Sequence, residues 1–141
     1  MSAAARVFKG YWETLTPEGV TRIGEHYTED AYFRDPFNEV SGHTELKRIF
    51  THMFETMHEP RFRIREVVEE GGSAFFVWDF TFRAKTWKPE VTRTIHGSTH
   101  VRFAPDGRVA YHRDYWDAAG ELYAKLPIVG PLMRWLAKKV G

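Results

Sequence analysis

Residues 109–117 read VAYHRDYWD and place ionisable groups among aromatic side chains. In a strand successive side chains point to opposite faces, so His112, Asp114 and Trp116 share one face. Carboxyl and imidazole groups walled by Phe and Trp lose hydration, which raises a carboxyl pKa and lowers an imidazole pKa toward neutrality. Groups of this kind exchange protons near pH 7, so the stretch predicts acid/base chemistry.

The remaining motifs argue against metal and cofactor chemistry. His96 and His100 share a strand face but lie roughly 13 Å apart at about 3.3 Å per residue, too far to share one ion. His112 and Asp114 could meet at an ion, but the sequence shows no third ligand beside them. The chain has no Gly-x-Ser-x-Gly, no phosphate-binding glycine loop and no Rossmann fingerprint. We therefore expect no metal and no cofactor.

Composition narrows the class of protein further. A chain of 141 residues fits one domain, and 16% aromatic residues indicate a wide interior. The net charge of +1 disfavours a nucleic-acid partner, and the absence of cysteine removes disulfides and thiolate chemistry. The start lacks an apolar signal segment, and no run reaches the roughly 18 apolar residues of a membrane span. We expect a cytoplasmic protein with no membrane span.

Hydrophobic periodicity predicts helices first and strands later. The helices are expected over residues 3–15, over a short segment opened by Thr16 and Pro17 that reaches Tyr27, and from Thr44 to a stop at Pro60. The strands are expected over 31–35, 61–69, 73–84 and, as a hairpin, about 92–117. This order predicts an α+β fold in which a curved, antiparallel or mixed sheet wraps around three N-terminal helices.

Residues 118–141 are expected to form a C-terminal helical tail on a single domain spanning 1–141, whose core covers about 5–117. The tail predicts two short helices separated by a hinge at 127–131. Its last turn is basic and amphipathic, which fits contact with a membrane surface or a partner. An apolar helix face docked on the domain explains the same pattern.

The order of elements and several motifs resemble the nuclear transport factor 2-like superfamily, and within it the SnoaL-like and ketosteroid isomerase-like proteins. The resemblance rests on Tyr11 in the first helix, EDAYFRDPF around Asp35, Gly42 before the long third helix, and GSTHVRFAPDGRVAYHRDYWD. It covers about residues 5–117. It implies a cone of curved sheet closed by helices around an apolar pocket for a small molecule, and a homodimer formed through the convex sheet face.

The resemblance also implies roles for single residues. Asp35 takes the position of the general base of ketosteroid isomerase, and Tyr11 that of its oxyanion-hole tyrosine. Thr99 stands where the isomerase has a protonated aspartic acid; its hydroxyl can donate a hydrogen bond but is a weaker acid. His112 and Asp114 are similar to the acid/base pair of SnoaL-like polyketide cyclases. The pocket lining expected from the same comparison is Phe33, Phe54, Trp78, Phe80 and Trp116.

Each candidate has a structural alternative. Asp35 before Pro36 can cap a turn, and Tyr11 can be a core tyrosine bonded to a backbone carbonyl. His112 and Asp114 can form a pair that only holds the sheet.

The functional prediction is a cofactor-free acid/base enzyme of isomerase, cyclase or dehydratase type, acting on a small apolar carbonyl or polycyclic compound through an enol-like intermediate. In that scheme Asp35 takes the proton, Tyr11 and Thr99 donate to the oxyanion, and the His112 pair returns the proton. The alternatives are a non-catalytic ligand-binding or dimerisation module and an epoxide hydrolase. The hydrolase needs an Asp-Arg-Asp set, for which Arg113 lies on the opposite face.

Overall fold

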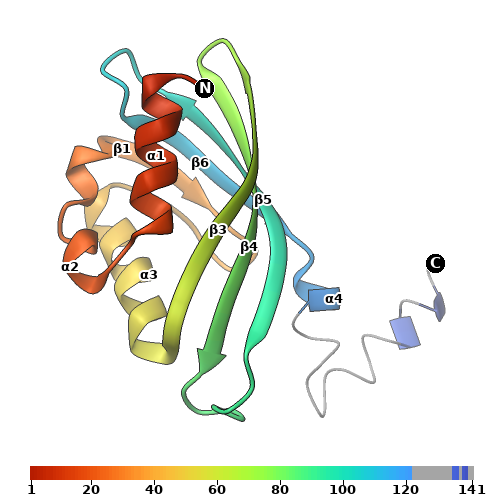
Figure 1. The fold of residues 1–141 in the computed structure, drawn as a ribbon. Helices are drawn as coiled ribbons and strands as arrows, with labels where there is room; N and C mark the ends of the chain where they lie inside the picture. The colour runs from red at the N-terminus through yellow and green to blue at the C-terminus, as the bar shows by residue number, and fades with distance from the viewer. Residues whose placement is uncertain (122–134, 137, 140–141) are drawn as a thin grey trace.

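Six strands form one curved, mixed sheet in the computed structural model, which describes residues 1–121, 135–136 and 138–139 (Figure 1). The strand order is β2-β1-β6-β5-β4-β3; β1 and β6 are parallel and the other neighbours are antiparallel. Helices α1 to α3 lie together on one side of the sheet (Figure 1). The elements are α1 (Ala3–Glu13), α2 (Pro17–Val20), η1 (Ile23–Glu25), β1 (Tyr27–Arg34), β2 (Glu39–Ser41), α3 (His43–Thr56), β3 (Met57–Glu70), β4 (Ser73–Ala84), β5 (Arg93–Phe103), β6 (Val109–Trp116) and α4 (Ala118–Glu121).

This architecture confirms the predicted α+β fold, and local capping explains where two helices begin. The Ser2 side chain accepts a hydrogen bond from the Ala5 N–H at the start of α1. The Thr16 hydroxyl accepts from the Gly19 N–H, and Pro17 is the first residue of α2, where a missing N–H costs nothing.

Two predicted boundaries are wrong. Tyr27 does not end a helix: α2 stops at Val20, η1 follows, and Tyr27 opens β1 opposite Val109 of β6. Pairing of β1 with β6 places Tyr27 in a strand. The apolar spacing predicted its burial correctly, but this spacing fits a buried residue of a helix or of a strand. Pro60 does not end α3 but lies inside β3, at the sheet edge, where the register shifts between His58 and Arg61. A proline is tolerated at such a place because no ladder hydrogen bond is lost.

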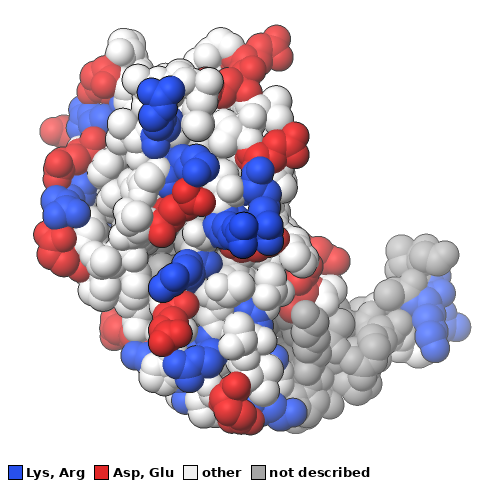
Figure 2. Space-filling model, in the orientation of Figure 1, with Lys and Arg blue, Asp and Glu red and all other residues white. Residues whose placement is uncertain are grey.

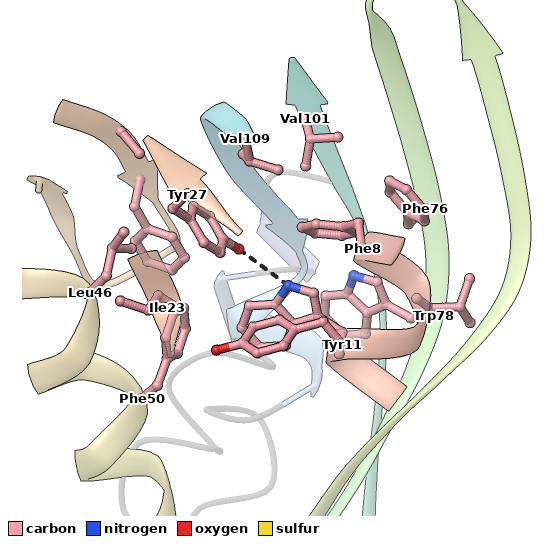
Figure 3. Packing of buried hydrophobic residues seen from close by; sticks show 14 of the residues in the cluster. Phe8, Tyr11, Ile23, Tyr27, Leu46, Phe50, Phe76, Trp78, Val101 and Val109 are labelled. Carbon is pink, nitrogen blue, oxygen red and sulfur yellow. Dashed lines mark hydrogen bonds between the residues drawn. The ribbon is translucent and has the colours of Figure 1, made fainter. Parts of the chain in front are cut away.

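The space between helices and sheet is filled mainly by aromatic side chains (Figure 3). Phe8 of α1 packs 4.6 Å from Phe76 of β4, and the two lie on the same side of the cluster as Trp78 (Figure 3). Tyr27 and Phe33 of β1 are at most 1% exposed. Each fully buried side chain of this size contributes about 1.5–3 kcal/mol, so the concave face of the sheet is a well-packed support for polar groups.

Neither the charged surface nor the described part of the tail indicates a particular kind of partner. Acidic and basic side chains are interspersed on the face shown in Figure 2, without a large patch of one sign. In the described part of the chain, no helix is both long and apolar enough to cross a membrane. The predicted hinge at 127–131 and most of the predicted tail helices lie outside the described residues, and α4 is the described beginning of the tail.

Candidate functional site

His112 lies at the centre of a buried hydrogen-bond network. It projects from β6 toward the helices, beside its register partner Phe33 of β1, and is 2% exposed. Its Nδ1 is 2.8 Å from the hydroxyl oxygen of Tyr27, and its Nε2 is 2.8 Å from Oδ1 of Asp114. The alternation of β6 therefore brings His112 and Asp114 together as the sequence predicted.

The neighbours of Tyr27 fix the tautomer of His112. An indole nitrogen can only donate, so Trp12 Nε1 donates to the Tyr27 oxygen at 3.2 Å, the bond drawn in Figure 3. Tyr27 is 0% exposed, and burial raises its pKa well above the ordinary value, so its O–H keeps its proton and needs an acceptor. Among the described residues, His112 Nδ1 is that acceptor. The ring proton is therefore on Nε2, which donates to Asp114.

A second series of donors reaches Asp114 from β4 and β5. Trp78 Nε1 donates to Thr99 Oγ1 at 2.8 Å, and the Thr99 hydroxyl donates to Asp114 Oδ1 at 2.6 Å. Oδ1 thus accepts two hydrogen bonds, from Thr99 and His112, while Oδ2 makes none with a described residue. The Asp114 side chain is 20% exposed, against 3% for His112. The network ends on one carboxylate that solvent can reach.

An interior cavity of about 40 Å³ lies against this network. It has space for a few waters at about 10–15 Å³ each, whereas pockets for drug-sized ligands measure roughly 300–1,000 Å³. The cavity alone therefore holds a small chemical group and not a polycyclic molecule. Its lining is Phe8, Trp12, Phe50, Phe62, Ile64, Phe76, Trp78, Thr99, His112 and Asp114.

A larger and more open cleft of about 540 Å³ lies where β1 and β6 end. We call it the outer cleft; its lining is Arg34, Asp35, Pro36, Arg113, Asp114, Tyr115 and Trp116. Asp114 is the one residue that these two linings share. The carboxylate therefore stands between an aromatic interior and a cleft that is wide enough for a ligand.

Tyr11 and Asp35 do not line the interior cavity. The Tyr11 hydroxyl donates to the Gly19 carbonyl oxygen at 2.8 Å, and burial raises its pKa to about 12. Asp35 Oδ1 accepts from the backbone N–H groups of Phe37 and Asn38 at 2.8 and 2.7 Å. Both residues thus have the structural partners that the sequence left open as alternatives, and Asp35 also borders the outer cleft.

The predicted lining residues are divided among several places. Trp78 lines the interior cavity and Trp116 the outer cleft. Phe33 packs 4.7 Å from the His112 ring, and Phe80 stacks 4.4 Å from Phe62. Phe54 borders a separate surface depression beside the end of α1.

Tyr27 and Trp12 are the members of the network that the sequence did not identify. In the sequence both fit the apolar stripe expected of a helix, so nothing there indicates that their polar atoms take part in hydrogen bonds. The available signal was that a buried Tyr or Trp needs a hydrogen-bond partner, without any indication of which one. Within the described residues no group of three His, Asp or Glu side chains is arranged to hold a metal ion.

Comparison of the sequence with models of known protein families identifies the family of this chain. A sequence model of the SnoaL-like domain matches residues 8–112. The chain belongs to the SnoaL-like domain family. A search of curated proteins gave no match to this SnoaL-like chain.

Solved structures share the fold of this SnoaL-like protein. A hypothetical protein with a ketosteroid isomerase-like fold from Catenulispora acidiphila, in complex with trimethylamine, has a TM-score of 0.73 and 11% identity over 86% of this chain and 91% of that one. A candidate SnoaL-like polyketide cyclase from Shewanella denitrificans has a TM-score of 0.71 and 19% identity over 89% and 100%. At such identities the likeness shows the nuclear transport factor 2-like fold alone.

Proposed function

We propose that this SnoaL-like protein is a cofactor-free acid/base enzyme that moves a proton at the carbon beside a carbonyl group, with Asp114 as the proton acceptor. One observation carries the proposal: Asp114 alone borders both the aromatic cavity and the outer cleft, and Oδ2 makes no hydrogen bond with a described residue. A general base must reach the proton it removes, and this oxygen has the accessible position.

His112 and Thr99 act as positioning residues in this scheme. Both donate to Oδ1 and hold the carboxyl plane in one orientation, since each is itself fixed by a buried partner. Tyr11 is left out of the proton transfer because its hydroxyl donates to the Gly19 carbonyl oxygen. Asp35 is left out because it does not line the aromatic cavity and both of its carboxylate oxygens already accept hydrogen bonds from local donors. The base is thus placed on β6 and not at the end of β1.

The chemistry follows from removal of one proton. Asp114 takes it from carbon and leaves an enolate, and return of the proton at another carbon is an isomerisation. Attack of the enolate on a second carbonyl, whose oxygen takes the proton back from Asp114, is a cyclisation. Loss of a β-hydroxyl, which takes that proton and leaves as water, is a dehydration. Because the interior holds only a small group, the reacting end of the substrate faces Asp114 and its body lies in the outer cleft.

Exchange of carbon-bound hydrogen tests the proposal without knowledge of the natural substrate. NMR in D₂O follows deuterium uptake at the carbon beside the carbonyl of 2-tetralone. We expect wild type to accelerate exchange, and Asp114→Asn to lose that acceleration by about 10²-fold or more. Asp30→Asn, an exposed carboxylate on β1, is the matched control and keeps the wild-type rate. Equal rates for the two variants contradict the role of Asp114, and no acceleration by wild type favours a non-catalytic binding module.

A homodimer through the convex sheet face is a second proposal, supported by exposed apolar side chains there. Val68 of β3 and its register partner Phe75 of β4 are 53% and 41% exposed, and Val77 of β4 is 38% exposed. Such a patch on a sheet is typical of an interface. Light scattering should give twice the chain mass for wild type and the chain mass for Phe75→Glu. Val7→Glu, at an apolar position of α1 that is 57% exposed and lies on the other side of the sheet, is the control.

A further inference from the structure

We propose that the outer cleft selects compounds that carry a carboxylate, which Arg113 and Arg34 bind while the carbonyl end faces Asp114. This inference rests on the proposed role of Asp114, because it places the charged end of the same substrate. The ligand class is an aromatic or otherwise flat carboxylic acid that also contains a carbonyl group.

The first observation is a pair of like charges on one face of the sheet. Arg34 of β1 and Arg113 of β6 are direct register partners, and both side chains line the outer cleft. Like charges directly opposite each other on neighbouring strands are destabilising. A bound anion between two guanidinium groups removes that repulsion.

The second observation is that these arginines are weakly compensated by the protein. Arg34 lies 3.8 Å from a carboxylate oxygen of Glu39. Arg113 forms no ion pair or hydrogen bond with a described residue, and its guanidinium carbon lies 4.7 Å above the ring of Tyr115. A guanidinium stacked on an aromatic ring keeps its N–H groups available for the two oxygens of a carboxylate.

The acidic residues of the outer cleft are held by local donors. Oδ1 of Asp35 accepts from two backbone N–H groups and from the side-chain amide of Asn38. Oδ1 of Asp114 accepts from His112 and Thr99. Neither carboxylate forms an ion pair with Arg34 or Arg113, so the basic side of the cleft remains open to an external anion.

Aromatic surface beside the arginines gives the rest of the ligand a place to lie. The outer cleft passes around the edge of β6 beyond Arg113, where pairing with β1 ends, so residues from both faces of β6 line it. Arg113 and Tyr115 come from one face, and Asp114 and Trp116 from the other. The Trp116 ring packs edge-on against Phe37 at 5.6 Å, which fixes one wall. A flat ring that bears a carboxylate matches this combination of aromatic and basic side chains.

Benzoate and benzamide test the inference because they share shape and differ in charge. Titrations followed by backbone and indole NMR shifts should show benzoate bound beside Trp116, and benzamide bound about tenfold or more weakly. Arg113→Gln should remove the preference for benzoate, and Arg113→Lys should retain part of it because the charge stays while the fork is lost. Arg102→Gln is the matched control, since Arg102 also lies over a tyrosine, Tyr111, but does not line the outer cleft.

Three results would overturn the inference: equal binding of the two probes, an unchanged preference in Arg113→Gln, or benzoate shifts confined to another part of the molecule. Asp114→Asn separates it from the proposed function, because this variant should lose carbon-hydrogen exchange and keep benzoate binding. Benzoate preference without exchange in wild type would overturn only the acid/base proposal. Exchange without benzoate preference would overturn only the carboxylate proposal.

Discussion

Replacing Tyr27 with phenylalanine tests the hydrogen-bond network at its most buried member. The change removes one oxygen and leaves two buried polar groups without their partner, Trp12 Nε1–H and His112 Nδ1. Each unsatisfied buried group costs about 1–3 kcal/mol, so we expect the free energy of unfolding to fall by about 2–6 kcal/mol. Urea denaturation of wild type and Tyr27→Phe measures the difference.

The matched control is Tyr32→Phe on the same strand, where the hydroxyl bonds to the exposed Glu39 and the loss should be within about 0.5 kcal/mol. The NMR chemical shifts of the His112 imidazole nitrogens report which ring nitrogen carries the proton, and the free energy of unfolding does not. Wild type should show His112 protonated at Nε2 with a bare Nδ1, and Tyr27→Phe should lose this single form. A proton on Nδ1 in wild type, or equal stability losses for the two variants, would refute the assigned direction of the network.

Three further predictions concern packing and pH. Gly97→Ala should destabilise the fold by about 1–3 kcal/mol in urea denaturation, because a Cβ there would lie 2.5 Å from a ring carbon of Trp78. Gly10→Ala in α1 meets no atom within 4 Å and should stabilise by about 0.5–1 kcal/mol. Burial raises the pKa of Glu13, but hydrogen bonds from a lysine and from the β3 backbone outweigh it and lower the pKa below 4.5. Its contribution to stability is fully present above the unfolded pKa of about 4.5 and is lost as the pH falls through the lowered folded pKa, so Glu13→Gln should flatten acid unfolding below about pH 4.5.

The sequence predicted which residues share a face far better than which residues touch. Strand alternation has a period of two, so His112 and Asp114 could be paired from their spacing alone. Thr99 was placed near them by resemblance, and the structure joins it to Asp114 by a hydrogen bond. Tyr27 could not be found in this way, because its partner is 85 residues away and depends on the parallel pairing of β1 with β6. No local sequence pattern indicates that pairing, because the two strands are far apart in the chain.

The network also explains why an ionisable pair can be buried without weakening the sheet. A buried polar group is costly only when its donors or acceptors are unmatched, and here each shared hydrogen has one donor and one acceptor. The indole N–H groups of Trp12 in α1 and Trp78 in β4 are the first donors of the two series, and an indole nitrogen accepts no hydrogen bond itself. The direction of every bond therefore runs toward Asp114, so the orientation of its carboxylate depends on the docking of α1 through Trp12. A change that loosens α1 should slow the proposed proton transfer at Asp114, measured as deuterium uptake, even though no residue of that helix touches the carboxylate through a hydrogen bond.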